Sequence, residues 1–378
     1  MPYKHLIHFA FNKELSEIYV ASVIKSFGIA MIGIFIPAYL INLNYPLNYI
    51  FAYYLFWVLS FLVLVVAIPH LYKKIGLKHA ILFSMPIQVV YFLLLYGLGP
   101  YNGLASSLWK LFFVVSVGAL ANALYWPAFH INFIASSDKK HRGEELGMMN
   151  IFSYMVVIFS PLIGGLIITY FGFTPLFILV TILLLISPIP LFFSTETYPE
   201  VKFSIKNLFH KRNLRNFSVF FVEGIVNYTE TVIWVIFIFI TLKSFIALGM
   251  LATLLIICTT VLTFIIGRLS DVMDKRKIMR AGIFSTSIIW FLKTLADSFF
   301  LFTIVNTLFG IAFTFLSVPY MALFYNKAAK THPAEFVIFR EVALGLGRIT
   351  ILAFIMLSGS FIGSFIIAGF SSLIFSFF

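Results

Sequence analysis

Long apolar runs alternate with short polar segments along the whole chain. The runs are about 18 to 27 residues long, and about 20 apolar residues in a helix cross the roughly 30 Å hydrocarbon layer of a membrane. Short connections such as "NLNYP" and "YFGFTP" place successive runs antiparallel. The pattern predicts twelve membrane-spanning helices, at residues 15–41, 48–70, 78–98, 108–134, 146–170, 173–193, 217–241, 245–267, 278–297, 299–325, 336–357 and 360–378.

The amino-acid composition is that of a membrane protein. Of the 378 residues, 61% are hydrophobic, 47 are phenylalanine and only 11% are charged, whereas charged residues make up about a quarter of a soluble domain. We therefore predict an all-α polytopic membrane protein. The single cysteine, Cys258, lies inside an apolar run, which excludes an intramolecular disulfide and a cysteine metal site.

The positive charges follow membrane topology rather than a nucleic-acid surface. The formal net charge is +12, and about 21 of the 26 lysines and arginines lie in the N-terminal segment and in the loops after every second run. The opposite loops hold only Lys110 and Lys243. This bias predicts a plasma (inner) membrane protein with both termini cytoplasmic and no nucleic-acid partner. The N-terminal segment lacks the apolar core and cleavage site of a signal peptide, so it is expected to remain as a cytoplasmic tail.

The chain divides into two similar halves. Residues 194–216 form the longest polar interruption, which predicts an N-terminal six-helix bundle at 1–193, a cytoplasmic linker at 194–216 and a C-terminal six-helix bundle at 217–378. The linker is expected either to lie on the membrane surface or to be solvated. The fourth run of each half reads G-x5-L-x2-P, at Gly118–Pro127 and Gly310–Pro319, which indicates an internal repeat.

Three motifs resemble those of the major facilitator superfamily. The segment "GRLSDVMDKRK" (267–277) is similar to the family loop G-x-L-x-D-R-x-G-R-R/K, "SSDKKHRGEELG" to D-x-x-x-R-G-x-x-x-G, and "SPLIGG" to the G-P-x-x-G-G element associated with exchangers. The matching residues are Gly267, Leu269, Asp271, Lys275, Arg276, Asp138, Arg142, Gly143, Gly147, Pro161, Gly164 and Gly165. The resemblance implies two six-helix bundles related by pseudo-two-fold symmetry around a central cavity.

The charged loop residues are candidates for a cytoplasmic gate. An Asp at a loop-to-helix junction caps the helix N-terminus, and nearby cations can pair with carboxylates on a neighbouring helix. The alternative is that these cations only orient the protein in the membrane by the positive-inside rule. We favour this alternative for Lys275 to Lys277 taken alone. Lys73 stands where the family has Asp, so a reversed latch is expected, with Lys73 or Lys74 meeting Glu335 or Glu341. The proposed gating residues are Gly267, Asp271, Lys275, Arg276, Lys73, Arg142 and Glu341.

Ionisable residues at membrane depth are costly and therefore candidates for function. The seventh run carries Glu223, Asn227 and Glu230 at i, i+4 and i+7, on one helical face. Lys25 in the first run and Arg348 in the eleventh balance the two carboxylates, so mutual pairing is expected. We predict that Glu230, with Glu223, carries a coupling proton; the alternative is structural ion pairs.

In the family fold, spans 1, 4, 7 and 10 line the cavity, which implies a set of substrate-binding residues. The set is Lys25, Asn122, Tyr125, Trp126, Asn227, Glu230 and Arg348. Lys293 is instead expected to reach the outer interface, and His130 to be a satisfied packing residue.

The leading hypothesis is a secondary transporter that works by alternating access. Proton-coupled export of a small amphipathic or charged organic solute is the first choice; uptake, facilitated diffusion, lipid translocation and a non-transporting sensor are alternatives. The expected partners are the small-molecule substrate, protons and the lipid bilayer, with the protein a monomer. The eight histidines are scattered and no H-E-x-x-H occurs, so no enzyme activity, metal or cofactor is expected.

Overall fold

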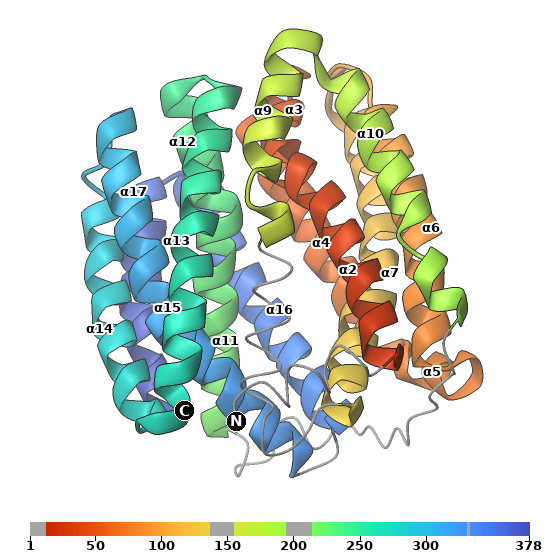
Figure 1. Ribbon diagram of the computed structural model, residues 1–378. Coiled ribbons are helices and arrows are strands. Elements are labelled where there is room, and N and C mark those ends of the chain that lie inside the picture. Colours follow the sequence, from red (N-terminus) through yellow and green to blue (C-terminus); the bar gives the residue numbers. More distant parts are fainter. Residues whose placement is uncertain (1–12, 137–154, 194–213, 331–332) are drawn as a thin grey trace.

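The protein is described here from a computed structural model that covers residues 13–136, 155–193, 214–330 and 333–378. All the regular secondary structure within these residues is helical, and no strand is present in them. Figure 1 shows α11 to α17 gathered on one side of the molecule and α2 to α10 on the other. We call these the second and the first helix group.

The first group contains the helices up to residue 193. They are α2 (Lys13–Ile32), the 3-10 turn η1 (Gly33–Phe35), α3 (Ile36–Asn42), α4 (Leu47–Ala67), α5 (Pro69–Ile75), α6 (Leu77–Tyr96), α7 (Leu104–Ser136), α9 (Ser160–Phe171), α10 (Phe173–Ile186) and the 3-10 turn η2 (Ile189–Phe193).

The second group begins at residue 214. Its helices are α11 (Leu214–Tyr228), the π-helical segment η5 (Thr229–Trp234), α12 (Val235–Leu242), α13 (Phe245–Val272), α14 (Lys275–Lys293), α15 (Phe299–Ala329), α16 (Pro333–Ser358), α17 (Phe361–Leu373) and the 3-10 turn η6 (Ile374–Phe377).

The predicted spans coincide with helices. In the described ranges, 9 helices are long and apolar enough to cross a membrane, and two shorter apolar helices lie at Met155–Phe171 and Phe361–Phe377. The run predicted at 278–297 is α14, whose first turn is strongly basic. The protein is a multi-pass membrane protein. The early part of the run predicted at 146–170 and most of the predicted linker, 194–213, lie outside the described residues.

Two of the spans are irregular at mid-length, and each irregularity has a local cause. Pro37 lacks the N–H that would bond to the carbonyl of Gly33, so α2 gives way to a 3-10 turn at Gly33–Phe35 before α3. In the seventh span the hydroxyls of Thr229 and Thr231 donate to the carbonyl oxygens four residues earlier, at 2.8 Å each. These bonds compete with the backbone ladder where the π-helical segment begins.

The predicted repeat has a structural counterpart. Gly118 on α7 faces Trp57 of α4, and Gly310 on α15 faces Leu255 of α13. Both helices also carry the repeat proline inside them, at Pro127 and Pro319. The same sequence positions therefore serve equivalent helix contacts in the two groups.

The most extensive contacts between the two groups are made by two helix pairs, α9 with α13 and α4 with α16. In the first pair, a Cβ on Gly165 would lie 2.6 Å from the carbonyl oxygen of Phe245, and one on Gly249 would lie 2.5 Å from that of Pro161. The amide of Leu162 donates to the Thr253 hydroxyl at 3.2 Å. Glycine at both positions lets the two backbones touch.

Candidate functional site

A cavity of about 460 Å³ lies between the first group and the seventh span. Residues of α2, η1, α4, α6 and α7 form most of its wall, and Tyr228, Thr231 and Val232 of the seventh span complete it. Its volume falls in the range of about 300 to 1,000 Å³ that is usual for small-molecule sites. Both irregular segments contribute to the wall, through Gly33 and Thr231, which fits the use of broken helices at transport sites.

Lys25 is the cation of this cavity. Lys25 is only 3% exposed, and its Nζ lies 2.9 Å from the centroid of the Tyr125 ring. Tyr125 is fixed in turn because its hydroxyl donates to Ser22 Oγ at 2.9 Å. Among the residues that the structure describes, no carboxylate forms an ion pair with Lys25. The ring face stabilises the ammonium group but leaves its positive charge uncompensated.

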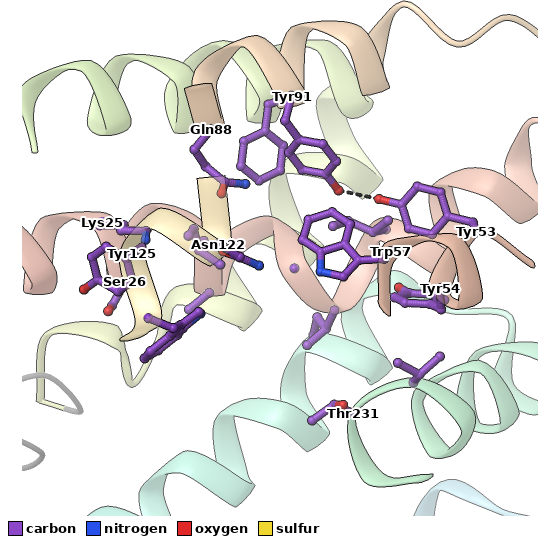
Figure 2. Close-up of a pocket in the computed structure, with 18 of the residues that line it drawn as sticks. Lys25, Ser26, Tyr53, Tyr54, Trp57, Gln88, Tyr91, Asn122, Tyr125 and Thr231 are labelled. Atoms are coloured by element: carbon purple, nitrogen blue, oxygen red, sulfur yellow. Dashed lines mark hydrogen bonds between the residues drawn. The ribbon is translucent and has the colours of Figure 1, made fainter. Parts of the chain in front are cut away.

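Neutral polar groups occupy the middle of the cavity. Figure 2 shows Gln88 and Asn122 between the Lys25 end and the aromatic end. The buried Oε1 of Gln88 has no hydrogen-bond partner in the described part of the chain, and an unsatisfied buried polar atom is costly. Together with Ser26, these amides could orient a polar ligand group beside Lys25.

Aromatic rings enclose the other end of the cavity. Figure 2 shows Tyr53, Tyr54, Trp57 and Tyr91 there. The ring centroids of Trp57 and Tyr91 are 5.1 Å apart at an interplanar angle of 81°, and the hydroxyls of Tyr53 and Tyr91 hydrogen-bond to each other. We call the set of Tyr53, Tyr54, Trp57, Tyr91 and Tyr228 the aromatic end.

Four predicted binding residues line this cavity, namely Lys25, Asn122, Tyr125 and Trp126. The tyrosines of α4 and α6, Trp57 and Gln88 were not predicted. They lie in apolar runs without charge, and only the packing of α4 and α6 against α7 reveals that they share a cavity.

The predicted pairing of Glu230 with Lys25 or Arg348 is wrong. Glu230 forms an ion pair with Lys293 of α14, which is fully buried rather than at the outer interface. The Lys293 ammonium lies 4.5, 4.4 and 3.8 Å from the ring centroids of Trp234, Trp290 and Phe309. Glu230 lies in the first turn of the π-helical segment, where the chain leaves the α-helical register, and its carboxylate meets α14 instead of the cluster of Glu223.

Glu223 belongs to a second polar cluster. It forms an ion pair with Arg340 of α16 and accepts a hydrogen bond from the Tyr320 hydroxyl at 2.5 Å. Arg340 also donates to Glu341 at 3.2 Å. Glu223, Asn227 and Tyr320 line a smaller cavity of about 180 Å³ inside the second group. Arg340 is therefore buried between two carboxylates.

Arg348 stands behind the main cavity. Its guanidinium carbon lies 4.9 Å from the ring centroid of Tyr228, and Nη2 donates to Asn227 Oδ1 at 3.4 Å. Its buried Nε has no partner among the described side chains. The structure therefore brings Arg348 to Asn227, but not to Glu230.

The structure places some of the predicted gating residues differently from the prediction. The helix cap predicted for Asp271 belongs instead to Asp274, which accepts from the Arg276 amide at 2.9 Å at the start of α14. Asp271 lies in the last turn of α13 because that helix continues to Val272; its side chain is outside the described set. Lys275 begins α14 and Gly267 lies within α13. Arg142 also lies outside the described residues.

The reversed latch is not formed in this conformation. Lys73 is exposed and has no ion pair in the described ranges, while Glu341 pairs with Arg340. A different contact joins the groups nearby: His130 Nδ1 and the Tyr325 hydroxyl are 2.8 Å apart, linking α7 to α15.

Tyr72 connects α5 to α7. Burial raises the pKa of Tyr72 well above its ordinary value, so its hydroxyl stays protonated and donates to the Ala123 carbonyl at 2.8 Å.

Three comparisons place the chain among known proteins. Residues 89–248 match the family model described as Major Facilitator Superfamily. The uncharacterized protein YqgE of Bacillus subtilis (strain 168) is 23% identical over 267 residues, a match of 66% of this chain and 61% of that protein. The chain thus matches less than two thirds of this curated relative's length. The crystal structure of the human organic anion transporter MFSD10 (TETRAN) superposes with a TM-score of 0.68 at 10% identity, over 97% of this chain and 98% of that one, which shows a shared fold.

Proposed function

We propose that this chain, whose residues 89–248 match the Major Facilitator Superfamily model, is a member of that family of membrane transporters. We propose further that it is a secondary transporter of a small organic anion and not an enzyme. The observation that carries this proposal is Lys25, a buried cation that faces a cavity of ligand size and has no described carboxylate partner. The cavity lies where the two helix groups meet, as alternating access requires.

The charge of Lys25 favours an anionic substrate. A buried ion without a counter-charge is costly, and an opposite charge placed beside it recovers part of that cost. The amide groups of Gln88 and Asn122 add donors for the remaining oxygens of a carboxylate or a similar group. The name of the structural neighbour, an organic anion transporter, agrees with this substrate class.

We also propose that transport is proton-coupled and that it exports the anion by antiport. The proposed proton carriers are Glu223 and Glu230, because each lies inside a spanning segment against a cation of another helix. Protonation of either carboxylate would remove the charge that holds Arg340 or Lys293, and so connect proton uptake to helix packing. The likeness of "SPLIGG" to the exchanger element supports antiport.

The proposed arrangement in the membrane follows the loop charges. We propose that the protein is a monomer of the plasma (inner) membrane, with both termini cytoplasmic. Residues 1–193 and 217–378 are the two proposed bodies that rock about the cavity, joined by the linker at 194–216.

The substrate class is tested by binding to the purified protein. Thermal unfolding with a panel of anionic, zwitterionic, cationic and lipid-like solutes should show stabilisation by organic anions. Lys25→Gln should weaken that binding by about ten-fold or more, as expected for a hydrogen bond to a charged group. Lys110→Gln, at an exposed lysine, is the matched control. Equal anion binding by wild type and Lys25→Gln would refute the proposal.

Proton coupling and direction need a flux measurement. In proteoliposomes with an imposed pH gradient, wild type should move the anion against the direction of proton flow. Glu223→Gln and Glu230→Gln should lose gradient-driven flux but keep anion exchange without a gradient. Flux in the same direction as protons would replace export by uptake, and gradient-driven flux in both variants would remove these carboxylates from the mechanism.

A further inference from the structure

We propose that the aromatic end of the cavity binds an aromatic ring, so that the transported anion is an aryl anion whose negative group lies at Lys25. This inference rests on the proposed function and specifies its substrate. The cavity has a charged end and an aromatic end, with the two amides between them, as Figure 2 shows. A ligand that fills it therefore carries an anionic group and a ring at opposite ends.

The length of the cavity suits such a molecule. Lys25, Gly33 and Ile36 all line it from the first span. Eleven residues of helix rise about 16 Å at 1.5 Å per residue, so the wall extends well beyond a single carboxylate. Short anions such as acetate would leave most of the aromatic end empty.

The rings of the aromatic end are oriented for stacking and edge contacts with another ring. Trp57 and Tyr91 are nearly perpendicular at 81°, and Tyr53 and Tyr54 at 84°, with centroids 5.1 Å apart in both pairs. Aromatic pairs prefer offset-stacked or edge-to-face geometry, so a ligand ring finds both faces and edges here. Because Tyr53 and Tyr91 bond their hydroxyls to each other, the wall offers their apolar surfaces instead of these polar groups.

The aromatic end also spans the two helix groups. Tyr54 belongs to α4 in the first group and Tyr228 to α11 in the second, and their ring centroids are 6.3 Å apart at 86°. A ring bound beside them contacts both groups at once. Its binding would therefore depend on how the groups sit relative to each other, which a transported substrate requires.

Gly118 sets the depth of the aromatic end. A Cβ at this position would lie 2.5 Å from the Trp57 ring and 2.7 Å from the Tyr91 ring. Both rings can lie against α7 only because no side chain intervenes. Gly118→Ala would push Trp57 away from α7 and into the cavity, which reduces the space for large rings before it affects small ones.

The test compares aryl anions with ring-saturated anions of the same charge and similar size. The probes are 3-phenylpropionate against 3-cyclohexylpropionate, and 1-naphthoate against its decahydro form, with 3-phenylpropionamide as the uncharged control. Affinities are measured on the purified full chain by calorimetry or thermal unfolding. The aryl anions should bind about ten-fold more tightly than their saturated partners, a difference of about 1.4 kcal/mol.

Three variants connect the preference to the aromatic end. Trp57→Leu should remove most of the aryl preference, and Trp57→Phe should retain it. Gly118→Ala should weaken 1-naphthoate more than 3-phenylpropionate. Thermal unfolding of each variant without ligand, compared with wild type, shows whether it is folded.

The outcomes separate this inference from the proposed function. If aryl and saturated anions bind equally, or if Trp57→Leu keeps the aryl preference, the ring site is wrong while anion transport stands. If no anion of either series binds, or 3-phenylpropionamide binds as tightly as 3-phenylpropionate, the anion site itself is wrong and both proposals fall.

Discussion

The buried lysines Lys293 and Lys25 differ in the groups that surround their ammonium groups. Lys293 is enclosed by three aromatic rings and pairs with Glu230, so its charge is compensated inside the second group. Lys25 rests on a single tyrosine ring and faces the cavity. The first arrangement is complete without a ligand, and the second is not.

Removing Lys293 should therefore destabilise the protein. Lys293→Met leaves the Glu230 carboxylate buried without its cation, which typically costs about 3 to 5 kcal/mol. The double variant Lys293→Met with Glu230→Gln should recover much of that loss, because no uncompensated charge remains. Thermal unfolding checks both, with Lys110→Met as the exposed-lysine control. A double variant no more stable than the single one would contradict this account.

At the scale of residues, the sequence identified charged site residues better than neutral ones. Lys25 and Tyr125 could be chosen because a charge or a polar face is rare in an apolar run. Tyr53 and Gln88 could not, since tyrosine and glutamine in such runs face the lipid, the core or a cavity with equal plausibility. The pairing of Glu230 was missed because i, i+4 and i+7 share a face only in a continuous α-helix, and the π-helical segment interrupts it.

The helices themselves were predictable because their apolar length is a direct consequence of membrane thickness. Their interruptions were not, although Pro37 and the threonine bonds explain them afterwards. The irregular segments of the first and seventh spans both line the cavity, which gives these breaks a functional meaning.

Straightening the first span should affect binding more than stability. Pro37→Ala restores an N–H and removes the ring clash, so η1 is expected to become regular α-helix. Thermal stability should stay the same or rise, while anion affinity should fall several-fold because Gly33 and Ile34 shift in the cavity wall. Pro86→Ala, at a proline inside α6 that does not line this cavity, is the control. Unchanged affinity in Pro37→Ala would show that the break does not shape the site.

The contact between α11 and α16 depends on glycine at close range. A Cβ on Gly347 would collide with the carbonyl oxygen of Phe221, and one on Gly224 with that of Leu344. Because backbone atoms cannot move aside, Gly347→Ala should separate the helices and lower stability by about 1 to 3 kcal/mol. It should also weaken the adjacent Arg348–Asn227 contact.

Gly99→Ala is the matched control for the α11–α16 contact, since its Cβ would meet no described atom within 4 Å. Thermal unfolding of the two alanine variants side by side checks the prediction. Equal melting temperatures would mean that α11 and α16 can separate without cost.

At the scale of the whole molecule, the two helix groups are joined by ring contacts and hydrogen bonds between several pairs of helices. Phe245 of α13 packs against Phe35 and Phe173 of the first group, with ring centroids 6.3 and 5.5 Å apart. The Leu162–Thr253 hydrogen bond joins α9 to α13, and the His130–Tyr325 hydrogen bond joins α7 to α15. Alternating access requires such contacts to part during the transport cycle.

A reversible cross-link tests whether the two groups move apart. In a Cys258→Ser background, Leu162→Cys with Thr253→Cys places two thiols across the α9–α13 contact, where amide and hydroxyl are 3.2 Å apart. Oxidation should stop anion flux in proteoliposomes, and reduction should restore it. Ser60→Cys with Ser116→Cys is the matched control, because those hydroxyls are 3.1 Å apart on α4 and α7 within the first group. Its disulfide should leave flux unchanged if that group moves as one body. Full flux through a completely oxidised 162–253 pair would mean that α9 and α13 stay together throughout the cycle.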